Sequence, residues 1–117
     1  MMGYRESTLP EVRRDLAEKV MSRYPGRLPL ICETDDDGLT IDKIKFLCPG
    51  TLELGQFILV LRGRIKDLRS SEALYLYLGD KGVLPPNSMT IGEAHAKYAD
   101  EEDNLLYIKF ARESTFG

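Results

Sequence analysis

The chain has 117 residues, of which 43% are apolar and 30% are charged, a composition typical of one globular domain. Nothing in it approaches the ~20 consecutive apolar residues of a membrane-spanning helix, and the first six residues lack the apolar core of a secretory signal. The net charge of −3 argues against duplex DNA as a partner, because DNA usually meets a basic domain.

The first predicted element is an amphipathic helix that ends before Pro25-Gly26. Thr8 to Glu11 has the pattern of a capping box, with Pro10 in the first turn, where its missing N–H does no harm. Apolar residues then recur every four positions and predict a buried stripe, namely Val12, Leu16, Val20 and Tyr24. The basic residues expected largely off that stripe are Arg13, Arg14, Lys19 and Arg23.

Two short strands are predicted next. Residues 28–33 are apolar apart from the final glutamate, and Pro29 indicates an edge strand or a strand start because proline cannot donate to a sheet. Asp35 to Gly38 predicts a turn. Residues 43–48 predict the second strand, which Pro49-Gly50 ends.

The strongest helix pattern follows, with Thr51 as the expected N-cap. Apolar residues fall at i, i+3, i+4, i+7 and i+11, namely Leu54, Phe57, Ile58, Leu61 and Ile65. Residues 73–78, in which leucine and tyrosine alternate, predict a strand. Residues 79–82 predict a turn, and Val83-Leu84 predicts a short fourth strand. Thr90 and Glu93 predict a capped helix to Tyr98, and residues 105–111 the last strand.

This order of a hairpin, one long helix and returning strands predicts an α+β fold. It is the order of the ubiquitin-like β-grasp arrangement, here with an additional N-terminal helical region. We expect a helical extension over residues 1–27, a β-grasp domain over 28–111 and a flexible C-terminal tail over 112–117.

No catalytic pattern appears. The sequence contains no nucleotide-binding glycine loop or nucleophile elbow, and its one histidine, His95, has no neighbouring ligand residues, so we expect it at the surface or in a cap. Cys32 and Cys48 lack metal-ligand spacing, and we interpret them as reduced thiols. We therefore predict a protein that is not an enzyme, with no metal and no cofactor.

The sequence ends at Gly117, after a tail with no packing pattern. A glycine carboxylate can enter a narrow enzyme channel because it has no β-carbon. This favours a chain whose own C-terminus is activated and joined to an amine; whether residues follow Gly117 in a precursor stays open.

Seven motifs in register resemble one family. They are Tyr24–Ile31, Lys45–Pro49, Leu54–Phe57, Leu61–Ile65, Pro85-Pro86, Leu106–Ile108 and Thr115–Gly117. Together they are similar to the autophagy ubiquitin-like modifiers, the family of GABARAP and the microtubule-associated protein light chains.

The resemblance implies conjugation of Gly117 to the headgroup amine of phosphatidylethanolamine on autophagic membranes. The implied partners are a ubiquitin-activating-like enzyme, a conjugating-like enzyme and a cysteine protease that processes or delipidates the C-terminus. It implies a cytoplasmic protein that becomes lipid-anchored on the autophagosome membrane, allows microtubules as a further partner, and gives no role to nucleic acid. The alternative is a non-conjugated ubiquitin-like adaptor in trafficking or cytoskeletal binding.

The resemblance also implies that receptor peptides with an aromatic residue and, three positions later, an aliphatic residue add a strand beside residues 45–49. The aromatic pocket resembles Val20, Pro29, Ile31, Lys45, Leu47 and Leu105. The aliphatic pocket resembles Phe46, Cys48, Pro49, Leu52, Phe57 and Val60. The basic residues that would face acidic flanks of the peptide are Arg27, Lys43, Lys45, Arg62 and Arg64.

The residues assigned to the peptide site also have a simpler interpretation. Most of these apolar residues, Ile31 and Phe57 above all, would simply be core, and Lys45 and Arg64 would be solvated charges. We expect replacement of Phe46 and Leu47 with alanine to abolish peptide binding and to leave the fold intact.

Overall fold

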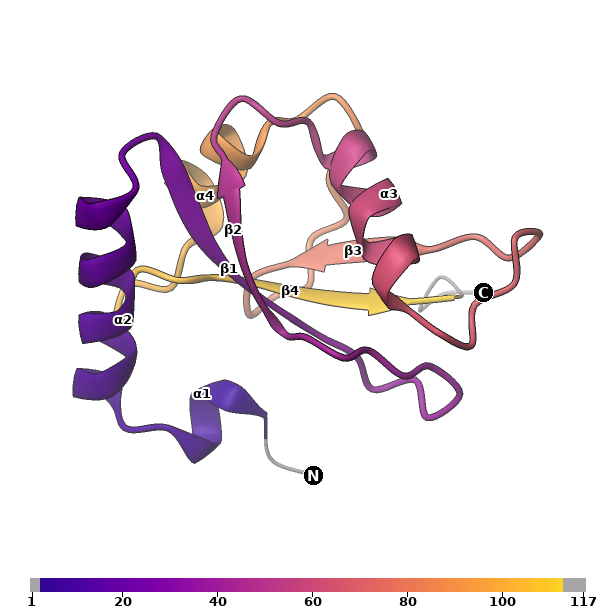
Figure 1. Cartoon of the computed structure of the whole chain (residues 1–117), viewed down its shortest axis with the longest axis horizontal. Helices are drawn as coiled ribbons and strands as arrows, with labels where there is room; N and C mark the ends of the chain where they lie inside the picture. Colours follow the sequence, from indigo (N-terminus) through magenta and orange to yellow (C-terminus); the bar gives the residue numbers. More distant parts are fainter. Residues whose placement is uncertain (1–2, 113–117) are drawn as a thin grey trace.

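The computed structural model describes residues 3–112, and its elements follow the predicted order with one addition (Figure 1). The addition is a single helical turn before the predicted first helix. The elements are α1 (Tyr4–Ser7), α2 (Pro10–Arg23), β1 (Arg27–Glu33), β2 (Lys45–Pro49), α3 (Leu54–Arg64), β3 (Tyr75–Leu78), α4 (Ile91–Tyr98) and β4 (Leu106–Ala111). Within residues 3–112, no helix combines the length and apolarity that crossing a membrane requires.

The four strands form one mixed sheet in the order β2-β1-β4-β3. β1 is antiparallel to β2 and parallel to β4, whereas β3 is antiparallel to β4. The first and last strands therefore lie side by side at the centre, and β2 and β3 lie outside them (Figure 1). This sheet and its helices confirm the predicted α+β class and the ubiquitin-like β-grasp arrangement.

Two apolar clusters lie on opposite faces of the sheet. Leu30 and Cys32 of β1 belong to the larger cluster, which includes residues of α3 and α4, whereas Ile31 between them belongs to the smaller one. The smaller cluster also contains Ala17 of α2 and Leu105. Because successive strand residues point to opposite faces, α3 and α4 cover one face and α2 covers the other (Figure 1).

Helix α2 buries a different stripe from the predicted one. Val12 is 53% exposed, whereas Arg13 is only 3% exposed and Ala17 only 1%. Arg13 can be buried because acidic side chains meet it, as described below. The predicted cap is also wrong: the N-cap is Leu9, without a side-chain hydrogen bond, because Thr8 already ends α1.

Helix α3 begins at Leu54, two residues after the start that an N-cap at Thr51 would give. Its N-cap is Glu53, whose N–H donates to Gln56 Oε1 at 3.0 Å, and not Thr51. The carbonyl of Leu52 accepts the N–H of Ile91 at 2.8 Å, so this stretch is tied to the start of α4. The helix can begin only after that contact.

The predicted cap of α4 is confirmed. Thr90 Oγ1 accepts the N–H of Glu93 at 3.1 Å, and the Glu93 carboxylate accepts the N–H of Thr90. The predicted turn before it is also present, with Gly79 at φ 70°, a conformation that favours glycine. The predicted fourth strand is reduced to a single bridge between Leu78 and Val83.

Pro29 does not mark an edge strand, because β1 is central. Pairing of β1 with β4 starts only at Leu30, so Pro29 is paired on one side, opposite Leu47 of β2. The N–H of Cys32 donates to the carbonyl of Ile44 on the β2 side, and by alternation the proline nitrogen faces away from β2. The missing N–H therefore costs no ladder bond.

Candidate peptide-binding site

Strand β2 forms a free edge of the sheet. Among the described residues it pairs only with β1. The carbonyl of Ile44 accepts from Cys32, so by alternation the backbone groups of Phe46 also face β1. The N–H and carbonyl groups of Lys45 and Leu47 then face outward. An extended peptide could form hydrogen bonds with these groups and extend the sheet.

The residues predicted to form the aromatic pocket differ in exposure; we refer to the buried ones as its floor and to the others as its rim. Its buried residues are Pro29, Ile31 and Leu105. Its half-buried or exposed residues are Val20, Leu47 and Lys45. The register sets Pro29 opposite Leu47 and Ile31 opposite Lys45, and Leu105 shares the smaller cluster with Ile31. Two of the three buried residues, Ile31 and Leu105, therefore also belong to a core cluster.

Tyr4 of α1 packs against this same cluster, which the sequence did not indicate. Its backbone N–H donates to Glu33 Oε2 at 2.9 Å, and the ammonium of Lys45 lies 5.2 Å from the centre of its ring. An aromatic side chain of the chain itself therefore lies beside the floor formed by Ile31 and Leu105.

The predicted aliphatic pocket is built mostly from the larger core cluster. Phe46, Cys48 and Phe57 are buried there, and the rings of Phe46 and Phe57 meet edge to face at 5.5 Å. The predicted residues that solvent can reach are the half-buried Pro49 and Leu52 and the exposed Val60. Because Phe46 is only 6% exposed, we now expect the double replacement of Phe46 and Leu47 with alanine to destabilise the fold as well as to weaken peptide binding.

The five predicted basic residues have different surroundings. Arg62 donates to the carbonyls of Glu72 at 2.8 Å and Arg69 at 3.0 Å, so it holds the loop after α3. Arg64 forms an exposed ion pair with Asp42 at 3.6 Å. The remaining three, Arg27, Lys43 and Lys45, are exposed around β2. Positive charge beside the free edge therefore comes mainly from these three.

A buried ionic cluster joins α2 to the segment before β4. The guanidinium of Arg13 donates to Asp103, which is 1% exposed, and to Glu102 Oε1 at 2.8 Å. The hydroxyl of Tyr107 donates to Asp103 Oδ2 at 2.6 Å, and the N–H of Leu105 donates to Oδ1 at 2.8 Å. Burial, followed by the hydrogen bond to Asp103, raises the pKa of Tyr107. The cluster fixes the helix that carries Val20 against the sheet.

The cysteines and the histidine lie in unreactive surroundings. Cys32 and Cys48 are free and buried, and burial raises the pKa of Cys48 to about 11 and that of Cys32 well above its usual value. A ring nitrogen of His95 lies 2.9 Å from the carbonyl of Asn104. Over residues 3–112, no group of three or more metal-ligating side chains is assembled.

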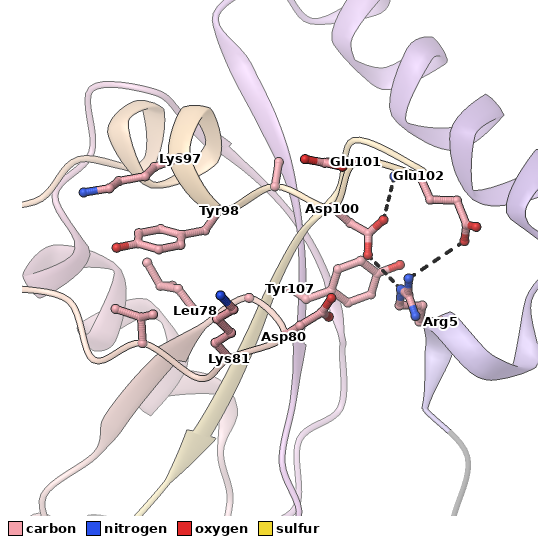
Figure 2. A pocket seen from close by; sticks show the side chains of 13 residues that line it. Arg5, Leu78, Asp80, Lys81, Lys97, Tyr98, Asp100, Glu101, Glu102 and Tyr107 are labelled. Carbon is pink, nitrogen blue, oxygen red and sulfur yellow. Dashed lines mark hydrogen bonds and ion pairs between the residues drawn. The ribbon is translucent and has the colours of Figure 1, made fainter.

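A hollow of about 620 Å³ lies away from β2, between α1, the turn after β3 and the end of α4 (Figure 2). Its walls mix both charges: Arg5 points to Asp100, with 2.7 Å between Nε and Oδ2, while Lys81 and Lys97 lie on other walls. It contains none of the predicted site residues.

The start of the predicted C-terminal tail is held to the body. Arg112, which follows β4, pairs with Asp36 at 2.8 Å and with Glu72 at 3.5 Å. The predicted conjugation residue, Gly117, lies outside the described residues.

A β-grasp sheet with a free β2 edge and helices ahead of it defines a ubiquitin-like protein with an N-terminal extension. The family model for "Autophagy protein Atg8 ubiquitin like" matches residues 12–117. The chain belongs to this Atg8 family.

Relatives agree over almost the full length. Autophagy-related protein 8 of Mycosarcoma maydis and that of Emericella nidulans are each 39% identical over 109 residues, which is 92% of this chain and 89% of theirs. The crystal structure of Trypanosoma brucei ATG8 is 39% identical, with a TM-score of 0.85 over 100% of this chain and 99% of that one. Plasmodium falciparum Atg8, solved with an Atg3 peptide, shares the fold at 23% identity and a TM-score of 0.82, over 97% of this chain and 98% of that one.

Proposed function

We propose that this protein is a ubiquitin-like modifier that is conjugated through Gly117 to phosphatidylethanolamine on autophagic membranes. The observation that supports this most is the family match, which continues through residue 117 and so includes the glycine. The protein would be cytoplasmic before conjugation and anchored to the autophagosome membrane after it.

The proposed chemistry is supplied by other proteins. An activating-like enzyme adenylates the carboxylate of Gly117, and its cysteine thiolate then displaces the nucleotide to form a thioester. A conjugating-like enzyme takes over the acyl group, and the lipid amine attacks the thioester, forming an amide and releasing the thiolate. A cysteine protease would cleave the precursor or the amide. Attachment to a two-chain lipid gives stable anchoring, which one acyl chain does not.

We further propose that the β2 edge binds receptor and adaptor peptides of the aromatic-x-x-aliphatic type. The outward backbone groups of Lys45 and Leu47 would pair with the added strand, and exposed cations around β2 favour an acidic peptide. A protein of the same fold, P. falciparum Atg8, is known in complex with an Atg3 peptide, which supports a peptide-binding role for the fold.

Replacement of Gly117 tests the conjugation. Wild type and Gly117→Ala would be incubated with activating and conjugating enzymes of the family, ATP and vesicles that contain phosphatidylethanolamine. We expect a lipid-dependent mobility shift for wild type and little or none for Gly117→Ala. An unshifted wild type favours the non-conjugated adaptor, and an equal shift of the variant contradicts the role of the glycine. Mass spectrometry of the conjugate distinguishes lipid from protein lysine as the acceptor.

A further inference from the structure

The end of β4 is anchored by a forked ion pair. The Nε and Nη2 atoms of Arg112 donate to Oδ2 and Oδ1 of Asp36, both at 2.8 Å, and Nη1 lies 3.5 Å from Glu72 Oε2. Arg112 and its partners are between 20% and 31% exposed, so they are partly shielded from solvent. Two parallel charged hydrogen bonds fix direction as well as distance.

The carboxylate that receives this fork is itself held in place. The N–H of Asp36 donates to Thr34 Oγ1 at 3.0 Å, and Thr34 Oγ1 donates to the carbonyl of Phe110 in β4. Asp36 Oδ1 also accepts the N–H of Gly38 at 3.0 Å. The loop after β1 is thus joined to Phe110 of β4 and to Arg112, the residue that follows this strand.

Gly38 leaves room for the guanidinium. A β-carbon at this position would lie 2.2 Å from Nη2 of Arg112 and would force the fork to move. The site therefore matches the arginine in charge, in hydrogen bonds and in space.

The fork lies close in sequence to Gly117, the residue proposed to be conjugated. Five residues separate Arg112 from the end of the sequence. Since an extended residue spans at most ~3.6 Å, the carboxylate of Gly117 can reach only about 18 Å from this anchor. Without the fork, the last anchored residue would be Ala111, which pairs with Tyr75 of β3, and the carboxylate could spread over a larger volume.

From this geometry we infer that Arg112 and Asp36 are positioning residues for acyl transfer, which fix the point where the conjugated tail leaves the domain. The inference rests on the proposed function. An enzyme that holds the body of the protein then finds the glycine within a limited volume, so the fork favours productive binding. The inference assigns Arg112 and Asp36 no part in the chemical step, because both side chains are engaged with each other and with the loop after β1.

The test compares variants of the full chain in thioester formation with the activating enzyme. Arg112→Gln removes the fork from the tail side, and Asp36→Asn weakens it from the body side without changing the tail. We expect both to raise KM about tenfold, which corresponds to 1.4 kcal/mol, with kcat unchanged, a pattern typical of lost binding. Lys109→Gln is the matched control, because Lys109 pairs with Asp35 at an exposed site.

A second measurement does not depend on activity. Hydrogen exchange of the backbone amides at Ala111 and Arg112 is expected to speed up in both fork variants, while the thermal midpoint of the domain changes by no more than a few degrees. Unchanged exchange would overturn the anchoring role.

The kinetic outcomes distinguish failure of the positioning role from failure of the proposed conjugation. If wild type forms no thioester, the proposed function fails and the inference falls with it. If wild type is loaded and Arg112→Gln is loaded equally well, only the inference fails. It also fails if Arg112→Gln is impaired and Asp36→Asn is not, because the enzyme would then contact Arg112 directly, or if Lys109→Gln is impaired as strongly.

Discussion

Replacement of Arg13 by methionine would test the buried ionic cluster. The substitution keeps much of the apolar length of the side chain and removes the cation from Asp103, whose side chain is fully buried. Removal of one partner of a buried ion pair costs about 3–5 kcal/mol. We expect the lower end, about 3 kcal/mol, because Tyr107 and Leu105 still donate to the stranded carboxylate.

Urea unfolding followed by circular dichroism would measure this change. With an m-value of about 2 kcal/mol/M, the midpoint should fall by about 1.5 M. Adding Asp103→Asn should restore at least half of the loss, because the asparagine carries no charge, its Oδ1 still accepts the N–H of Leu105, and its amide N–H can donate to the hydroxyl oxygen of Tyr107. Lys19→Met, which breaks an exposed ion pair with Asp15, is the control and should leave the midpoint unchanged. A shift below 0.5 M for Arg13→Met, or no recovery in the double variant, would refute the reasoning.

Two further predictions concern the rim of the peptide site and the fork at Arg112. Leu47→Ala should weaken binding of an aromatic-x-x-aliphatic peptide by about 2 kcal/mol, or roughly 30-fold, at little cost in stability, whereas Phe46→Ala should destabilise the domain by about 3–5 kcal/mol because its ring packs on Phe57. Titration calorimetry and urea unfolding separate the two effects, and wild-type affinity for Leu47→Ala would reject the assigned groove. The hydrogen bonds from Arg112 lower the pKa of Asp36 from 3.8 to about 2, so the stability they supply is complete above pH 4 and is lost as the pH falls towards 2. The difference in thermal midpoint between wild type and Asp36→Asn should thus be constant from pH 8 to 5 and shrink below pH 4; a difference that persists at pH 2 would contradict this assignment.

Sequence patterns predicted the secondary-structure elements that depend on residues close together in the chain. The spacing from Leu54 to Ile65 marks α3, and Thr90 with Glu93 marks the cap of α4, because both depend on residues within a few positions of each other. The order of the elements indicated the β-grasp arrangement, but periodicity alone did not give the order of the strands in the sheet. Pairing of β1 with β4 joins residues more than seventy positions apart, which no local pattern records.

The buried face of α2 was missed for the same reason. A helix position occupied by arginine is normally read as exposed, since an unpaired charge is costly to bury. The partners of Arg13 lie about ninety residues away, in an acidic run that reads as one solvated loop although Asp103 is buried and Glu101 is exposed. Only the folded structure brings these opposite charges together.

The two-residue period of β2 explains why peptide affinity and stability are coupled at the proposed site. Phe46 points into the larger cluster while Lys45 and Leu47 lie on the other face, so one strand serves the core and the groove at once. Ile31, which is predicted to lie at the floor of the aromatic pocket, is part of a core cluster. Substitutions at the floor therefore change folding as well as binding. If the site binds peptides as proposed, we expect selectivity to vary at rim residues such as Leu47 and Val20, which are half-exposed and whose replacement removes little buried surface.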